Sequence, residues 1–139
     1  MERPDTPTVI LDSQNQMLKH GGVLYRTGCA SCHQSDGRGM EGVGPPLQDS
    51  EWVSMSDEIL VRIVLQGLHG AIEVNGMEYN LEMPAMGFYA NEEIANILSY
   101  LRYTWGNKKP VSTETTKRIR EATENQIDSW NMEQLSEFL

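Results

Sequence analysis

The chain has 139 residues and a formal net charge of −9, a length that suits one compact domain. The negative charge disfavours nucleic acid and anionic membranes as partners and favours a protein with a basic docking patch. The acidic excess lies in residues 1–107, which carry six basic and fourteen acidic side chains, against five and six in residues 108–139. No apolar run is long enough for a transmembrane helix, and the first residues lack the apolar core of a secretory signal.

The N-terminal part of the chain predicts a polar segment followed by a helix. Residues 1–12 are interpreted as a tail or linker remnant, since Pro4 and Pro7 interrupt a polar sequence. Ser13 and Gln16 have capping-box spacing, and the apolar and small residues that follow predict a helix over residues 14–27. Its glycines weaken this helix unless they serve close packing. The Gly- and Pro-rich residues 29–50 predict an irregular loop wrapped around something.

Four further helices are predicted from their caps and spacing. Ser56 starts a helix that Gly67 stops, and Asn91 caps another that ends near Gly106. After a hinge at residues 108–110, Ser112 caps a fourth helix. A capping box over residues 131–134 suggests a last short helix. No segment predicts a convincing strand, so the expected fold class is all-α.

The chemistry of the chain is concentrated in Cys29-Ala30-Ser31-Cys32-His33, a C-x-x-C-H motif typical of c-type haem attachment. Two thiols one helical turn apart can each form a thioether with a haem vinyl group, and the adjacent imidazole can then bind the iron. A structural zinc site is the first alternative, although it needs four ligands and the chain has only two cysteines and three histidines. A thioredoxin-like redox pair is the second, although it normally follows a buried strand.

Residues 17–106 resemble a small class I, mitochondrial-type cytochrome c domain. Gly21 and Tyr25 match a glycine and an aromatic residue that pack on the C-terminal helix in that family, where Ile97 and Tyr100 lie. Residues 44–47 match its Gly-Pro-x-Leu segment, in which the Pro45 carbonyl would accept a hydrogen bond from His33. The resemblance implies three core helices around one haem in residues 13–107 and a helical extension at residues 108–139.

The resemblance also implies the residues that surround the haem. His33 and Met83, which precedes a proline, would be the axial ligands, with Met86 and His69 as rival ligands. The residues expected to contact the haem are Pro45 and Leu47 from the loop, Trp52 and Trp105 as shields of the haem edge, and Arg62 or Arg38, Tyr79 and Asn80 at the propionates. The tryptophans and the propionate contacts have ordinary packing or surface roles as their alternatives.

With both axial positions filled, such a domain transfers single electrons and does not act as an enzyme. The alternative function is a haem enzyme or gas-responsive domain in which Met83 leaves the iron. The extension implies a fused or associated dehydrogenase, or else it folds back and enlarges the core through Ile119, Ile127, Trp130, Leu135 and Phe138. Because haem c is attached outside the cytoplasm, the family resemblance implies a periplasmic or otherwise exported protein.

Overall fold

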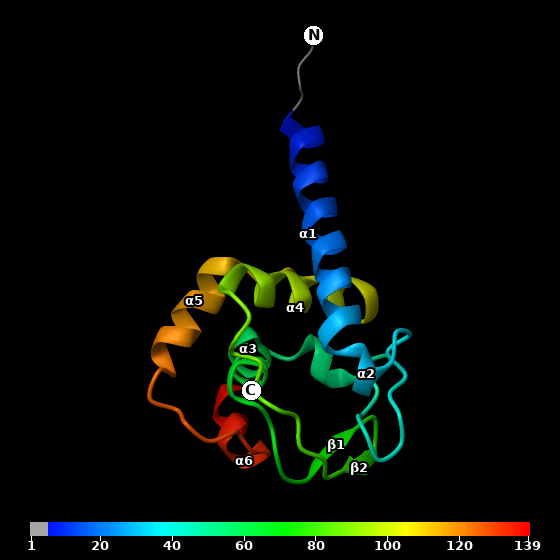
Figure 1. Cartoon of the computed structure of the whole chain (residues 1–139), viewed down its shortest axis with the longest axis vertical. Coiled ribbons are helices and arrows are strands. Elements are labelled where there is room, and N and C mark those ends of the chain that lie inside the picture. The colour runs from blue at the N-terminus through cyan, green and yellow to red at the C-terminus, as the bar shows by residue number, and fades with distance from the viewer. Residues whose placement is uncertain (1–5) are drawn as a thin grey trace.

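The computed structural model describes residues 6–139, with side chains described from residue 13 onward. This part of the chain is mostly helical (Figure 1), as the all-α prediction requires. Its elements are α1 (Thr6–Gly28), α2 (Ala30–His33), the 3₁₀ helix η1 (Glu51–Ser54), α3 (Asp57–Gln66), β1 (Ile72–Val74), β2 (Met77–Tyr79), α4 (Asn91–Trp105), α5 (Thr113–Ala122), α6 (Met132–Leu135) and the 3₁₀ helix η2 (Ser136–Phe138). No helix in the described residues is long and apolar enough to cross a membrane.

Helix α1 begins at Thr6, well before the predicted start at residue 14. Ser13 therefore lies inside the helix, and the prediction that it caps the helix with Gln16 is wrong. Pro7 does not prevent this start, because proline is tolerated in the first turn, where its missing N–H has no helical partner. The predicted tail at residues 1–12 is thus helical from Thr6 on, while its residues 1–5 lie outside the described residues.

Most of the other predicted helix boundaries are confirmed. The side chains of Ser56, Ser112 and Asn131 accept hydrogen bonds from the first turns of α3, α5 and α6. The start of α4 differs by one residue, because Ala90 is the N-cap and Asn91 is already helical. The Glu93 carboxylate accepts the Ala90 N–H at 2.8 Å, which satisfies one N-terminal donor without a capping oxygen at Asn91.

Two short segments depart from the sequence predictions. The expectation that no strand exists is wrong, because β1 and β2 form an antiparallel hairpin in which Ile72 pairs with Tyr79. The turn consists of Asn75 and Gly76, both with positive φ, and Asn-Gly between two strands is a strong hairpin signal. The predicted irregular loop at residues 29–50 also begins with one regular turn, α2.

The close crossing of α1 and α4 explains the glycines in the first helix. A Cβ on Gly21 would lie 2.7 Å from the carbonyl carbon of Asn96 and 2.9 Å from the Tyr100 Cβ. One turn later, the Tyr25 ring packs against Tyr100 with 5.7 Å between centroids. Gly21 and Tyr25 thus contact α4 as the family resemblance implied, although the neighbour of Gly21 is Asn96 and not Ile97.

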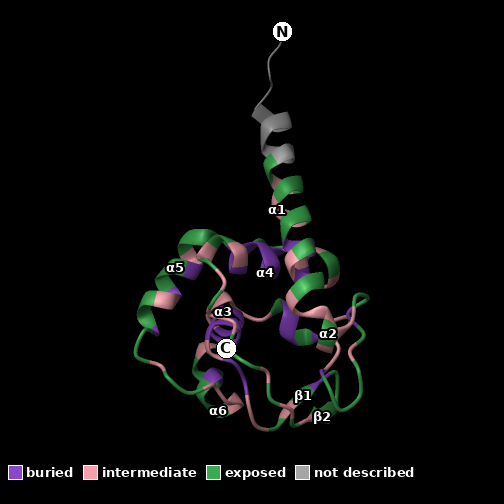
Figure 2. Ribbon diagram, in the orientation of Figure 1, coloured by how far each residue is buried: buried purple, intermediate pink, exposed green. Residues whose placement is uncertain are grey.

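Buried residues are prominent on α3 and α4 (Figure 2). The buried side chains form two clusters. The first joins α1, α3, α4 and α5, and includes Tyr25, Val61, Ile94 and Ile119. The second joins the other side of α3 to the hairpin and the C-terminal residues, and contains Trp52, Ile59, Ile63, Leu68, Val74 and Leu135. The extension thus buries Ile119 and Leu135 as predicted, whereas the prediction for Ile127 is wrong, since it is 92% exposed. A cavity lies between the two clusters.

Candidate haem site

The short helix α2 brings the three motif residues together at the cavity. The N–H of Cys29 donates to the Tyr25 carbonyl, so the chain turns directly from α1 into the motif. The N–H of His33 then donates to the Cys29 carbonyl at 3.0 Å, which closes one helical turn. As a result, Cys29, Cys32 and His33 all line one cavity. Burial, and next the neighbouring Cys32, raise the pKa of the Cys29 thiol to about 11.

The His33 ring is held by the loop that follows the motif. Its Nδ1 lies 2.8 Å from the Pro45 carbonyl oxygen, the contact that the family resemblance implied. A carbonyl only accepts, so Nδ1 carries the proton and Nε2 keeps its lone pair. Burial lowers the pKa of the imidazole and outweighs the Pro45 bond, which raises it. The lowered pKa favours the neutral ring that a metal ligand requires. Gly44 allows this approach, since a Cβ there would lie 2.6 Å from the Cys32 carbonyl oxygen.

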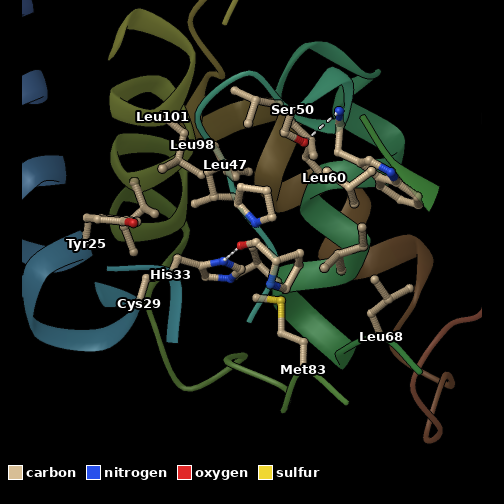
Figure 3. A pocket seen from close by; sticks show the side chains of 18 of the residues that line it. Tyr25, Cys29, His33, Leu47, Ser50, Leu60, Leu68, Met83, Leu98 and Leu101 are labelled. Atoms are coloured by element: carbon tan, nitrogen blue, oxygen red, sulfur yellow. Dashed lines mark hydrogen bonds between the residues drawn. The ribbon is translucent and has the colours of Figure 1, made fainter. Parts of the chain in front are cut away.

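The cavity beyond His33 is lined almost entirely by apolar side chains from α1, α3, α4 and the loops (Figure 3). A second cavity adjoins it and shares Cys29, His33, Leu68 and Met83 with it. An apolar lining beside a histidine and two thiols suits a large flat apolar cofactor.

Met83 reaches this cavity from the segment between the hairpin and α4. Its N–H donates to the Leu68 carbonyl at 2.8 Å and its carbonyl accepts the Leu68 N–H at 3.0 Å, which fixes its backbone beside the end of α3. Figure 3 shows the Met83 and His33 side chains in the same cavity. Met86 lines the cavity as well, and its N–H donates to the Val64 carbonyl at 2.7 Å. Both methionines therefore remain candidates on position alone.

Several other predicted contacts also reach the cavity. Pro45, Leu47 and Trp52 line the cavity beyond His33, and Tyr79 lines the second cavity that adjoins it. The Trp52 indole N–H donates to the Glu73 carbonyl at 2.8 Å and so attaches the hairpin to the cavity wall. These four residues therefore line the two adjoining cavities, and their contact with haem stays a prediction.

Other predicted contacts lie elsewhere. Arg62 is buried on the opposite side of α3, where it pairs with Glu58 at 2.6 Å and stacks on Phe138. Asn80 and Arg38 line a shallow groove outside the cavity. The alternative contacts Trp105 and His69 are also used otherwise, since Trp105 packs on Tyr25 and His69 bonds Ser129. For Arg62 and Trp105 the packing interpretation is therefore the better one.

Sequence reasoning assigned part of the cavity wall to an ordinary core. The missed residues lie on one face of α3 and one face of α4 that border the cavity. They are Leu60, Ile63 and Val64 of α3 and Ile97, Leu98 and Leu101 of α4. A closed core and a cavity wall have the same apolar pattern, so periodicity alone does not separate them. The signals that something else fills the space were the C-x-x-C-H motif and the length of the glycine-rich loop, and neither identifies the helical residues of the wall.

The two alternatives to haem find no support in the described residues. In this part of the chain no three His, Cys, Asp or Glu side chains lie together as a metal site needs. The motif follows a helix, and the strands of the described region form a two-stranded antiparallel hairpin, which differs from the sheet of a thioredoxin-like protein.

Comparison with known proteins agrees with this geometry. The sequence profile of the family described as Cytochrome c matches residues 18–105. The chain is 36% identical over 110 residues to cytochrome c-552 of Thermus thermophilus, an alignment that covers 72% of this chain and 83% of that protein.

Two further relatives are larger. The cytochrome c subunit of a quinone alcohol dehydrogenase of Gluconobacter oxydans is 28% identical over 121 residues, which is 84% of this chain and 25% of that subunit. The cytochrome subunit of a fructose dehydrogenase of Gluconobacter japonicus is 31% identical over 109 residues, with 72% and 22% covered. The chain belongs to the cytochrome c family, whose members carry covalently attached haem c and transfer electrons.

Proposed function

We propose that Cys29 and Cys32 attach one haem c to this chain and that His33 and Met83 bind its iron, so that the domain relays electrons from a redox enzyme to an acceptor. The observation that carries this proposal is the position of the His33 imidazole and the Met83 thioether in one apolar cavity beside both cysteines.

The chemical roles follow from the side chains. When bound, haem c supplies the one-electron ferric/ferrous couple. The Pro45 carbonyl orients His33 and increases its basicity as a ligand. The Met83 thioether favours ferrous iron and so raises the reduction potential. The apolar wall works in the same direction, because it excludes water that would stabilise the ferric charge. Two protein ligands leave no open position, which is why this family member transfers electrons and is not a catalyst.

Met83 is proposed over Met86 because of what surrounds it. Reciprocal hydrogen bonds with Leu68 fix the backbone at Met83, and Pro84 after it restricts the same segment. Met86 packs against the first core cluster, with its N–H bonded to the end of α3. Packing does not separate the two methionines, since Met83 packs against the second cluster. The proposal therefore depends on the paired backbone at Met83 and on the proline that follows it, as in the family resemblance.

The test is a pair of variants, Met83→Ala and Met86→Ala, with the ferric absorption spectrum and the reduction potential as readouts. Met83→Ala is expected to abolish the weak red charge-transfer band of methionine-bound ferric haem and to lower the potential. Met86→Ala is the matched control and is expected to leave both nearly unchanged. The reverse pattern would assign the ligand to Met86.

We further propose that the partner docks through a basic patch. The groove and cavity on the hairpin side carry the exposed acidic residues Glu41, Glu78 and Glu82, in line with the net charge of −9. Opposite charges would steer the encounter, so the rate of electron transfer should fall as ionic strength rises. A rate that is independent of salt would contradict this docking mode.

The donor that we propose is a dehydrogenase, fused to this domain or associated with it. Two of the similar proteins are cytochrome subunits of dehydrogenases, which supports an electron relay next to a separate active site. Since haem c is attached outside the cytoplasm, we also place the protein in the periplasm or another exported location. Cell fractionation of the producing bacterium tests this: haem-stained protein in the cytoplasmic fraction alone would refute it.

A further inference from the structure

We propose that the C-terminal extension, residues 108–139, is a brace that keeps Met83 in the cavity, and that Arg120 is its principal positioning residue. The inference rests on the proposed ligation by Met83. The segment concerned is residues 83–89, called here the methionine loop, which joins the hairpin region to α4. The extension supports both ends of this loop, through Trp130 at one end and Arg120 at the other.

The first support is a small backbone ladder. Leu68 forms an antiparallel bridge with Met83 on one side and a parallel bridge with Trp130 on the other. The Trp130 N–H donates to the Gly67 carbonyl at 3.0 Å, and its carbonyl accepts the His69 N–H at 2.8 Å. The backbone at Leu68, to which Met83 is hydrogen-bonded, is therefore also paired with Trp130 of the extension.

The second support is Arg120 of α5, which bonds the other end of the methionine loop. Its guanidinium donates to the Gly87 carbonyl at 3.0 Å, the Tyr89 carbonyl at 2.6 Å and the Asn91 side-chain oxygen at 2.6 Å. Three acceptors on one planar group are a geometry that arginine satisfies and lysine does not. Hydrogen bonds from a charged donor are also stronger than neutral ones. Arg120 therefore joins the end of the loop to the start of α4.

The brace is rigid because α5 is itself anchored. Ile119, next to Arg120, is fully buried in the first core cluster. Thr123 accepts a hydrogen bond from the Gln66 side chain at 2.8 Å, and the Trp130 indole N–H donates to the same Gln66 at 2.9 Å. Arg118 forms an ion pair with Glu58 of α3, away from the methionine loop. This last pair gives a matched control on the same helix.

The functional consequence concerns loss of Met83 from the iron. An added ligand such as imidazole can replace Met83 only if the methionine loop moves. The apparent affinity of the protein for imidazole therefore depends on the equilibrium between the closed and the open loop. Because the bonds of Arg120 stabilise the closed loop, removing them should strengthen imidazole binding. The loss of one charge-assisted hydrogen bond is enough for a shift of about tenfold.

The experiment titrates ferric holoprotein with imidazole and compares Arg120→Met with Arg118→Met. Both substitutions replace an arginine of α5 by a long apolar side chain. Arg120→Met, which removes three charge-assisted hydrogen bonds, is expected to bind imidazole at least about tenfold more tightly than the unchanged protein, and Arg118→Met less than about twofold more tightly. Arg120→Lys is a milder variant with an expected intermediate affinity, and it serves if Arg120→Met does not fold. Equal affinities for the Arg118 and Arg120 variants would overturn the proposal.

A second readout separates this proposal from the ligand assignment. The amide hydrogens of Met83 and Met86 are bonded to Leu68 and Val64, so a looser loop should exchange them faster in Arg120→Met than in Arg118→Met. If Met83→Ala does not change imidazole affinity, the ligand assignment fails, and exchange alone then decides on the brace. Unchanged exchange rates at both amides would refute the brace whichever methionine is the ligand.

Discussion

Two adjacent glycines in α1 offer a sharp test of the packing between α1 and α4. Each glycine costs the helix about 1 kcal/mol relative to alanine, so Gly21→Ala and Gly22→Ala gain the same amount from propensity. A Cβ on Gly21 would meet backbone atoms of Asn96, with the carbonyl carbon at 2.7 Å, and these atoms cannot move without moving α4. A Cβ on Gly22 would meet the edge of the Tyr100 ring at 3.0 Å, and a side chain can shift by a few tenths of an ångström.

The two variants should therefore differ in stability. Because the contact at Gly21 is with backbone atoms, overpacking there costs about 2–3 kcal/mol, the upper part of the usual range. The propensity gain offsets about 1 kcal/mol of this, so Gly21→Ala should lower the free energy of unfolding by about 1–2 kcal/mol. Gly22→Ala should stay within about 0.5 kcal/mol of the unchanged protein, because a small ring shift offsets the gain. The assay is urea unfolding of the holoprotein followed by circular dichroism. Gly21→Ala as stable as Gly22→Ala would show that the close crossing does not exist.

The remaining predictions concern the close approach at Gly67 and the ion pairs of Glu58. Gly67→Ala should cost about 2–4 kcal/mol, since φ is +90° there and the new Cβ would lie 2.6 Å from the Met83 carbonyl oxygen; Gly76→Ala, with φ of +81° and no atom near the Cβ, should cost only about 1–2 kcal/mol. Urea unfolding checks both, and equal costs would contradict the close approach. Burial would raise the pKa of the Glu58 carboxyl, but hydrogen bonds from Arg118 and Arg62 outweigh burial and hold the pKa below its usual 4.5. The stability that Glu58 contributes is thus present above about pH 4.5 and is lost as the pH falls below it; Glu58→Gln should flatten this acid loss, by at most about 1 kcal/mol for a partly exposed pair, and an unchanged acid profile would contradict it.

The sequence predicted the local features that short-range chemistry determines. Ser56, Gly67 and Ser112 mark helix ends because capping depends on residues within one turn. The motif residues were found because covalent attachment needs a fixed spacing, and Pro45 was found through the resemblance of residues 44–47 to a segment of the family. The hairpin at Asn75 was missed although its turn signal was present in the sequence.

Long-range contacts could not be predicted in the same way. Arg62 was expected at the haem, but the structure places it against Phe138, which lies 76 positions later in the chain. Likewise, the bonds of Arg120 to the methionine loop depend on how α5 folds back, which no local pattern encodes. Side chains with several possible partners are therefore the ones whose roles required the three-dimensional structure.

The most direct test of the central claim is the absorption spectrum of the purified holoprotein, ferric and then ferrous, with and without carbon monoxide. A closed site with His33 and Met83 on the iron predicts sharp low-spin bands that carbon monoxide does not change. A Soret band that shifts on addition of carbon monoxide would mean that one position is open or easily vacated. That result would contradict a closed electron carrier and favour a haem enzyme or gas-responsive domain.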